Sequence, residues 1–212
     1  MDIEGPALES LIRSARKQIR GRMQALRLAV PAAARARRDA ALVARLLVLP
    51  EVAGARTIAL FSPMEGRGEI ELRALDAHVR EGARGVLYPR LSERALEPGE
   101  AVPSLSGELA LGALTDLVES DAGFLEPPRT VQAAVRGEVD VIVVPALAVS
   151  ATGHRLGYGA GFYDRVLPAY CPPAFAIAVA YDFQLVAELP VFEWDFACNA
   201  VVTDTRTLRV TG

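Results

Sequence analysis

The stretch that decides the fold reads Asp140-Val-Ile-Val-Val-Pro-Ala-Leu-Ala-Val-Ser-Ala-Thr-Gly-His-Arg-Leu-Gly-Tyr-Gly-Ala-Gly-Phe-Tyr-Asp164. It opens with an apolar run that ends at Pro145, which predicts a buried strand. Four glycines follow within nine residues, at 153, 157, 159 and 161, and a helical stretch begins at Phe162. Glycine lacks a Cβ and accepts positive φ, so backbone N–H groups can approach a ligand closely. With the positive end of the following helix, these groups predict an anion site, for which phosphate is the natural ligand.

Two common nucleotide-binding motifs do not account for these glycines. The pattern that starts at Gly157 has Phe162 at its sixth position, so it is not the dinucleotide fingerprint G-x-G-x-x-G. The only lysine is Lys17, which no glycine-rich loop precedes, so the chain is not a P-loop NTPase. From the residues alone, a plain tight turn remains the alternative to a phosphate site.

Helices and strands alternate on both sides of this stretch. Helices are predicted at 7–28, from about 31 to 49, at 69–80 and at 162–170, and strands at 57–61, 85–88, 140–144, 175–180 and 200–203. Pro89 and Arg90 are expected to stop the strand at 85–88, and residues 92–136 to form short strands and loops. The alternation predicts a single α/β domain over residues 1–212. It has three α/β/α layers around a mostly parallel central sheet and begins with an N-terminal pair of helices.

Ligands of such sheets bind at the carboxyl ends of the strands. This rule points to residues 62–69, 89–90 and 146–164, and to the chain from Asp182 onward.

The helix predicted at 7–28 has two unlike faces. One face is apolar and includes Leu8, Leu11 and Met23. The opposite face is basic, with Arg13, Arg16, Lys17, Arg20 and Arg27. A basic helix face is usually solvated, so this face is expected in water unless it contributes to the phosphate site.

Composition excludes several classes of protein. Hydrophobic residues make up 51% of the 212 positions, which excludes wholesale disorder. A formal net charge of −3 argues against a dedicated nucleic-acid binder. The two cysteines form no C-x-x-C pair, so a structural zinc site is not expected. With no signal peptide and no run of 18 apolar residues, the protein is expected to be soluble and cytoplasmic.

Four residues suggest chemistry by their type and position. Arg155 can pair bidentately with phosphate oxygens, and Asp164 and Asp195 are candidate Mg²⁺ ligands beside a bound nucleotide. Each carboxylate also has an ordinary interpretation, as a helix-terminal charge for Asp164 and as a surface group for Asp195. Trp194 is interpreted equally well as a shield for a ligand or as a packing aromatic.

The same stretch resembles the 5-formyltetrahydrofolate cyclo-ligases, also called 5,10-methenyltetrahydrofolate synthetases. Their hallmark is an apolar strand, Pro, a short linker and G-x-R-L-G-x-G-x-G-[YF]-Y-D. The resemblance extends over nearly the whole chain through further motifs in the family's order. They are the basic spacing Arg16 and Arg20, the acidic motif 69–71, the pair Pro89-Arg90, the element 123–127, and Gln184, Pro190 and Asp195.

The resemblance implies an ATP- and Mg²⁺-dependent enzyme. It would convert 5-formyltetrahydrofolate to 5,10-methenyltetrahydrofolate through a phosphorylated formyl intermediate and release ADP and phosphate. Its expected partner is a small-molecule folate substrate, with no nucleic acid and no membrane, and the protein is expected to be a monomer or weak homodimer.

The family's functional residues carry over as follows. The catalytic residues would be Arg155 and Tyr163. ATP would bind Arg16, Lys17, Arg20, Arg155, Leu156, Gly157, Tyr158, Gly159, Ala160, Gly161, Phe162 and Tyr163. The folate would bind Ser62, Met64, Glu69, Tyr158, Gly159, Ala160, Gly161 and Phe162. The metal ligands would be Asp164 and Asp195.

Several positions depart from the family pattern. Arg16 stands where Lys is usual, Ala160 where Gly or Lys is common, Phe162 where Tyr is common, and Asn199 where a second Asp is usual. These departures leave open a second hypothesis, a folate- or nucleotide-binding paralogue with weak catalysis. A third hypothesis, a nucleic-acid binder that uses the first helix, is disfavoured by the acidic remainder of the chain and the lack of aromatics between its basic residues.

Overall fold

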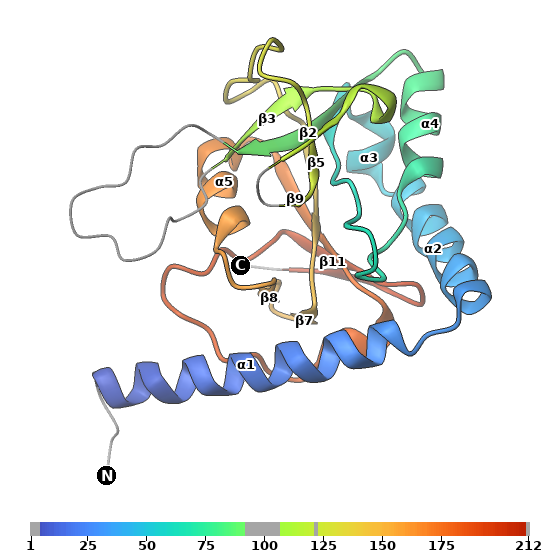
Figure 1. Cartoon of the computed structure of the whole chain (residues 1–212). Helices are drawn as coiled ribbons and strands as arrows, with labels where there is room; N and C mark the ends of the chain where they lie inside the picture. The colour runs from blue at the N-terminus through green and yellow to red at the C-terminus, as the bar shows by residue number, and fades with distance from the viewer. Residues whose placement is uncertain (1–4, 92–106, 121–122, 211–212) are drawn as a thin grey trace.

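A seven-stranded sheet forms the centre of the molecule (Figure 1). The computed structural model describes residues 5–91, 107–120 and 123–210. The strand order is β12-β11-β9-β6-β1-β2-β3, in which the five inner strands are parallel and the two edge strands antiparallel to their neighbours. This sheet confirms the predicted fold class. Its strands are β1 (Thr57–Ala59), β2 (Gly85–Leu91), β3 (Gly107–Leu111), β6 (Val141–Pro145), β9 (Phe175–Val179), β11 (Ala200–Val202) and β12 (Thr207–Arg209).

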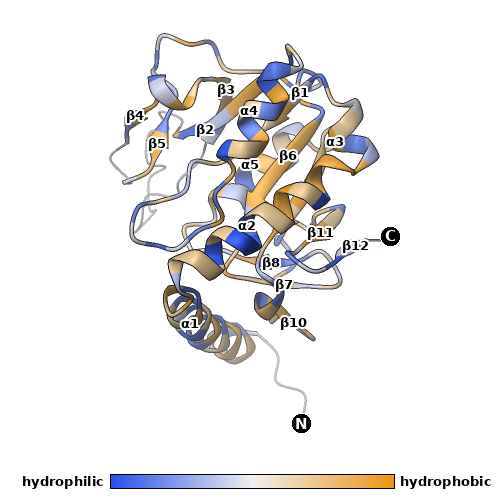
Figure 2. Cartoon of the chain, turned by 90° about the vertical axis from the view of Figure 1, so that its right-hand side faces the viewer, coloured by the Kyte–Doolittle hydropathy of each residue, from blue (hydrophilic) through white to orange (hydrophobic). Residues whose placement is uncertain are grey.

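The inner strands are buried on both faces, as continuous apolar sequence in a parallel sheet requires. Along β6, Val141 and Val143 face one hydrophobic cluster, whereas Ile142 and Val144 face the other. The first cluster is covered by α2 (Ala32–Leu47), α3 (Pro50–Gly54) and α4 (Arg73–Glu81), and the second by α5 (Phe162–Tyr170). Figure 2 shows α2, α3 and α4 in front of the hydrophobic strands of the sheet. The three layers are therefore α, β and α, as predicted.

Helix α1 (Pro6–Leu28) lies outside these layers, along one end of the molecule (Figures 1 and 2). It packs on a three-stranded sheet of β7 (Ala148–Ser150), β8 (Arg155–Leu156) and β10 (Leu185–Val186), through a cluster that includes Met23 and Leu147. Leu147 is the second residue after the end of β6, so α1 lies across the carboxyl end of the central sheet. None of the described helices, α1 included, combines the length and apolar character that crossing a membrane requires.

The orientation of α1 differs from the expectation for its two faces. Leu8 and Leu11 are 43% and 54% exposed, whereas Arg16 and Arg27 are only 8% and 2% exposed. The helix turns part of its basic face toward the protein because polar groups there receive the guanidinium hydrogen bonds. The expectation of a solvated basic face is therefore wrong for Arg16 and Arg27.

Strand β2 runs past the point at which Pro89 was expected to end it. Pro89 lies opposite Leu109 of β3. The Leu109 N–H donates to the hydroxyl of Tyr170, and the Leu109 carbonyl accepts from the Ala134 N–H. No ladder hydrogen bond is needed from Pro89 at this position, so its missing N–H costs nothing there.

One helix begins later than predicted, and one short helix was not predicted. Helix α4 begins at Arg73 rather than at 69, because the Glu69 side chain is bound in the preceding loop. Helix α2 ends before Pro50 as predicted, but Pro50 then opens the short helix α3, where a proline at the first position loses no hydrogen bond.

The region predicted to hold short strands and loops does so where it is described. Residues 92–106 lie outside the described ranges. Beyond β3 the elements are the 3₁₀ turn η1 (Leu114–Asp116) and a two-stranded sheet of β4 (Val118–Glu119) and β5 (Leu125–Glu126). A further 3₁₀ turn, η2 (Asp182–Gln184), precedes β10.

Candidate active site

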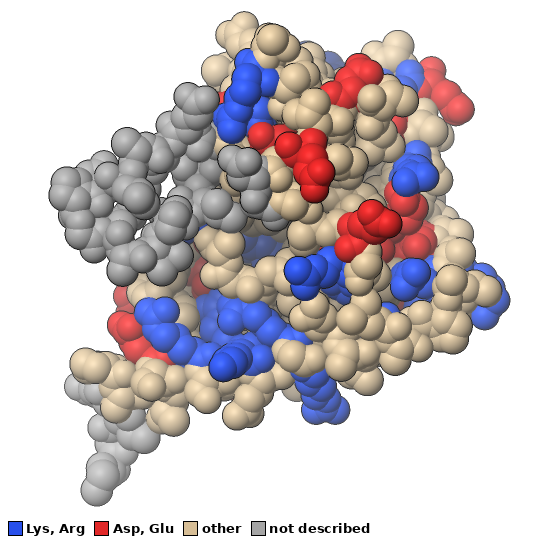
Figure 3. All heavy atoms as spheres, viewed as in Figure 1, with Lys and Arg blue, Asp and Glu red and all other residues tan. Residues whose placement is uncertain are grey.

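A cavity of about 770 Å³ lies between α1, the ends of the central strands and the glycine loop, residues 157–161. Its volume is within the roughly 300–1,000 Å³ typical of small-molecule sites. Phe61 and Ser62 follow β1, and Ala146 follows β6, so the cavity is at the carboxyl end of the sheet, as expected. Figure 3 shows Lys and Arg side chains gathered above α1, around the hollow of this face. Six cationic side chains (Arg13, Arg16, Lys17, Arg20, Arg155 and Arg165) and three carboxylates (Glu69, Asp164 and Asp195) line it.

The cavity brings together the site residues predicted from the sequence, with one exception. Leu156 does not line it; this side chain is 1% exposed and packs against Met23 in the cluster beneath α1. The structure adds lining residues that the site prediction did not include, namely Arg13, Phe61, Pro89, Phe124, Pro145, Ala146, Leu147, Arg165, Phe192 and Trp194. Arg13 had a usable signal, since it shares a helix face with Arg16 and Arg20. Trp194 also had one, since it precedes Asp195 and was interpreted equally as a ligand shield or a packing aromatic. Phe61, Phe124 and Phe192 had no such signal.

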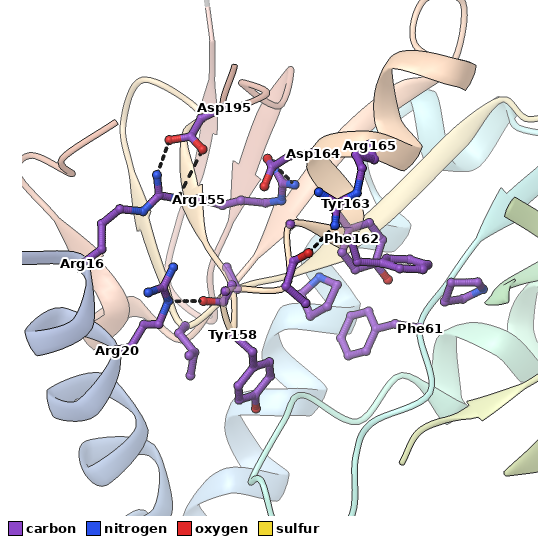
Figure 4. A pocket seen from close by; sticks show the side chains of 18 of the residues that line it. Arg16, Arg20, Phe61, Arg155, Tyr158, Phe162, Tyr163, Asp164, Arg165 and Asp195 are labelled. Atoms are coloured by element: carbon purple, nitrogen blue, oxygen red, sulfur yellow. Dashed lines mark hydrogen bonds and ion pairs between the residues drawn. The ribbon is translucent and has the colours of Figure 1, made fainter. Parts of the chain in front are cut away.

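The glycine loop is held against α1. Arg20 Nε donates to the carbonyl of Gly157 at 2.9 Å (Figure 4). Gly159 has φ 110°, and a Cβ there would lie 3.2 Å from the guanidinium carbon of Arg20. Gly161, in the left-handed region at φ 66°, caps α5, whose N-terminus lines the cavity. Glycine is therefore favoured at 159 and 161 by backbone conformation, and a Cβ at either position would also press on an arginine side chain.

Gly153 has a different role from the glycines of the loop. It lies in the turn between β7 and β8 with φ 82°, and a Cβ there would meet the carbonyl oxygen of Cys198 at 2.3 Å. Its N–H bonds Ser150 and its carbonyl accepts from Cys198. The alternative of a plain tight turn is thus correct for Gly153.

Two arginine–aspartate ion pairs form part of the cavity wall (Figure 4). Arg16 binds both carboxylate oxygens of Asp195, at 2.7 and 3.2 Å. Arg155 donates to Asp164 at 2.9 Å and to the carbonyl of Phe196 at 2.9 Å. The residues predicted to bind phosphate and those predicted to bind metal therefore neutralise one another in this structure.

The Arg16 guanidinium is not fully satisfied by its pair with Asp195. Its Nε is buried and has no hydrogen-bond partner among the residues that the structure describes. An unsatisfied buried donor costs about 1–3 kcal/mol, and the cost is recovered when an acceptor binds. Burial, and then the charge of Arg16, lower the pKa of Arg20. An orphaned donor and crowded cations both favour an anionic ligand at this end of the cavity.

A second polar cluster forms the other end of the cavity. Glu69 is 7% exposed, and its carboxylate accepts from the Met64 N–H at 2.7 Å. The guanidinium of Arg27 lies 4.0 Å from that carboxylate, donates to the Tyr158 hydroxyl, and donates to the carbonyl of Arg67 at 2.9 Å. Burial raises the pKa of Glu69. Burial, with the charge of Glu69, raises the pKa of Tyr158 to about 12, so its hydroxyl is protonated at neutral pH. Arg27 thus joins the glycine loop, through Tyr158, to the loop that carries Glu69.

Aromatic rings form another part of the wall. Phe162 packs edge-on against Tyr163 at 5.1 Å and against Phe124 at 6.1 Å between ring centroids. The Arg155 guanidinium lies 5.9 Å from the centre of the Tyr163 ring. Burial, and then the charge of Glu69, raise the pKa of the Tyr163 hydroxyl, which therefore stays protonated. This wall suits a flat, partly apolar ligand beside the charged end.

The set of carboxylates limits the kind of metal site available. Within the described ranges, no three His, Cys, Asp or Glu side chains gather as a metal cluster. Asp164 and Asp195 line the same cavity, and Mg²⁺ in nucleotide sites is usually held by one or two carboxylates together with phosphate oxygens. The donors therefore fit a cation that arrives with a phosphate ligand.

Several known proteins are similar to this chain in sequence or in structure. A protein of Mycolicibacterium smegmatis called 5-formyltetrahydrofolate cyclo-ligase is 39% identical over 153 residues, which cover 71% of this chain and 75% of that protein. An Escherichia coli K12 protein of the same name is 32% identical over 164 residues, 76% of this chain and 85% of that one. The NMR structure of 5,10-methenyltetrahydrofolate synthetase from Aquifex aeolicus matches 93% of each chain, with 26% identity and a TM-score of 0.75.

The model of the 5-formyltetrahydrofolate cyclo-ligase family matches residues 12–204. This range includes the basic residues of α1, the loop of Glu69, the glycine loop and Asp195. The chain therefore belongs to the 5-formyltetrahydrofolate cyclo-ligase family, as its motifs predict.

Proposed function

We propose that this protein converts 5-formyltetrahydrofolate to 5,10-methenyltetrahydrofolate, with ATP as phosphoryl donor and Mg²⁺ as its companion ion. The observation that carries the proposal is a single cavity, in a chain of this family, with a phosphate-type end and a separate polar end at Glu69. The first end combines the glycine loop, the N-terminus of α5 and most of the six cationic side chains. Such a combination binds polyphosphate strongly.

The pterin of the folate would lie at the Glu69 end of the cavity. A buried carboxylate can accept hydrogen bonds from the amino group and ring N–H of a pterin. Tyr158 and Phe162 would flank the ring, with Ser62 and Met64 at its edge. This placement brings the formyl group on N5 toward the glycine loop, where the terminal phosphate of ATP would lie.

The reaction needs positioning and charge neutralisation more than covalent catalysis. The formyl oxygen attacks the γ-phosphorus, and the bond from that phosphorus to the oxygen of ADP breaks. N10 then attacks the formyl carbon and loses its proton, while the carbon–oxygen bond breaks and phosphate leaves. Arg155 would neutralise the transferred phosphoryl group, and the protonated hydroxyl of Tyr163 would donate to an oxygen of the reacting groups. Arg16, Lys17 and Arg20 would hold the remaining phosphates.

Asp164 and Asp195 would hold the Mg²⁺ ion. A bound Mg²⁺ would neutralise phosphate charge and orient the γ-phosphate. Arg16 and Arg155, which now pair with these carboxylates, would then bind phosphate oxygens in their place. The proposed state therefore exchanges the ion partners of these two arginines and two aspartates within the cavity.

The departure at Ala160 does not leave the loop without a nearby cation. Arg165 donates to the Ala160 carbonyl and also lines the cavity. A positive charge is thus present beside the position at which relatives often carry a lysine.

The direct test is the absorbance of methenyltetrahydrofolate on mixing the protein with 5-formyltetrahydrofolate, Mg²⁺ and ATP. We expect this absorbance to rise when all three are present and to stay unchanged when any one of them is omitted. Nucleotide and folate binding without any rise would refute the enzyme and leave the binding paralogue. Absence of both binding and turnover would refute both assignments.

Replacing Arg27 with methionine is expected to raise the KM for the folate roughly tenfold to a hundredfold, because hydrogen bonds to charged groups contribute about 1.5–3 kcal/mol. The substitution leaves Glu69 and Tyr158 without their shared cation. Steady-state kinetics at saturating ATP measure this change.

A matched control comes from a second cluster outside the cavity. Arg80 binds Asp76 at 2.8 Å, and the Tyr88 hydroxyl donates to the same carboxylate at 2.8 Å. Arg80→Met should reduce stability without changing the KM for the folate. Equal KM values for both variants and the wild type would contradict the role given to Arg27.

A further inference from the structure

Trp194 is placed unusually for a large apolar side chain. It is the only tryptophan of the chain, lines the cavity, and is 60% exposed. A packing aromatic would be covered by its neighbours. Its exposure within the cavity leaves it accessible to a ligand bound there.

One face of the indole is already supported. Phe192 stacks on Trp194 with 4.6 Å between ring centroids and 10° between the ring planes. The guanidinium groups of Arg13 and Arg16 lie 5.3 and 4.9 Å from the centre of the Phe192 ring. With one face occupied by Phe192 and most of the side chain exposed, the opposite indole face is available for stacking.

The turn that carries both rings is fixed. The Phe192 N–H donates to the Asp195 carboxylate at 2.8 Å, and the Asp195 N–H donates to the Phe192 carbonyl at 3.0 Å. Asp195 is itself held by Arg16 of α1. The Trp194 platform, defined as the stacked rings of Phe192 and Trp194, is therefore positioned before any ligand arrives.

Three arginines along α1 show how far this platform lies from the end of the cavity proposed to bind the pterin. Arg13, Arg20 and Arg27 recur every seven residues, which is nearly the same face of a helix, about 10 Å apart at each step. Arg27 contacts the Glu69 cluster, Arg20 the glycine loop, and Arg13 the ring of Phe192. About 21 Å of helix thus separates the two ends of the cavity, with the phosphate-type loop between them.

We propose that the purine base of the nucleotide stacks on the open face of Trp194. This proposal rests on the proposed function, which puts the γ-phosphate near the glycine loop and the pterin at Glu69. The other end of the nucleotide then extends toward Arg13, where the platform offers the flat apolar surface that a base requires. Stacking tolerates different bases, because every base has a π face, so the platform selects for a planar base more than for adenine.

The test is nucleotide affinity and turnover in Trp194→Ala and Trp194→Phe. Loss of one stacking contact lowers affinity roughly 5-fold to 150-fold. Trp194→Ala should raise the Kd and KM for ATP within this range, with little change in kcat at saturating ATP or in the KM for the folate. Trp194→Phe should restore most of the affinity. Because the side chain is largely exposed, neither variant should lose the fold, which the thermal unfolding midpoint checks.

Tripolyphosphate separates base stacking from phosphate binding. It should bind wild type and Trp194→Ala equally, and it should leave the emission of the only tryptophan nearly unchanged, whereas ATP should quench it. Equal ATP affinity in wild type and Trp194→Ala, with methenyl formation intact, would refute the platform and leave the proposed function standing. A wild-type protein that binds folate but no nucleotide would overturn the proposed function and the platform together.

Discussion

Replacing Arg155 with alanine is expected to lower kcat about 10³-fold or more, the effect seen when an arginine is removed from a phosphoryl-transfer site. The Arg155 side chain is 4% exposed, and its guanidinium binds the carboxylate of Asp164. Under the proposed mechanism, this group neutralises charge that develops only during transfer, so the loss falls on kcat more than on KM. Single-turnover formation of methenyltetrahydrofolate measures it.

Stability has to be separated from catalysis in this variant. Arg155 also donates to the Phe196 carbonyl, so alanine removes the guanidinium from both that carbonyl and Asp164, whose carboxylate keeps the Phe196 N–H at 3.4 Å. Arg155→Lys keeps the positive charge but cannot donate two hydrogen bonds from one planar group. It should therefore recover only part of kcat. Arg206→Ala removes a more exposed arginine–aspartate pair, with Asp182, away from the cavity and should leave kcat unchanged. A folded Arg155→Ala protein with nearly wild-type kcat would remove Arg155 from the mechanism.

Replacing Gly159 with alanine is expected to lower kcat/KM for ATP roughly 100-fold. The backbone at φ 110° is a conformation that L side chains rarely adopt, and the new Cβ would press on the guanidinium of Arg20. Strain of this kind costs about 1–3 kcal/mol. The loop would relieve it by moving, and a displacement near 1 Å at a reacting group costs about 100-fold in rate. Steady-state kinetics with ATP varied measure the loss.

Gly137→Ala is the matched control for backbone strain alone. Gly137 also has a positive φ, 92°, but no atom lies within 4 Å of its Cβ position, and it does not line the cavity. Both variants should lose stability to a similar degree, and only Gly159→Ala should lose affinity for ATP. Normal ATP kinetics in Gly159→Ala would show that the loop does not need its observed conformation to work.

Local sequence signals were sufficient for most of the fold. The run at 140–144 is apolar at each of its last four positions, and only a strand covered on both faces accommodates such a run in a water-soluble sheet. The same kind of reasoning located β9 and β11, and helical periodicity located α1, α2 and α5. These signals depend on neighbours in sequence, which is why they can be interpreted without the tertiary structure.

Local signals were insufficient where a residue elsewhere in the chain determined the end of a strand, the start of a helix or the role of a glycine. Pro89 continues its strand because Leu109 bonds elsewhere, and Glu69 stays out of α4 because the Met64 N–H binds its carboxylate. Gly153 serves a backbone contact with Cys198 rather than a phosphate. In each case the deciding partner is fixed by a fold that local pattern does not encode.

By itself, the sequence determined the parallel sheet, the glycine loop ahead of a helix, and membership of the cyclo-ligase family, because these follow from periodicity and from residues at fixed spacing. Only the tertiary structure decided that α1 turns Arg16 and Arg27 inward, and that Arg16 meets Asp195 across 179 residues of sequence. It also decided that Trp194 presents an uncovered face to the cavity. The physical reason is that burial and ion pairing depend on which surfaces the fold brings together, and that choice is settled by the packing of the whole chain.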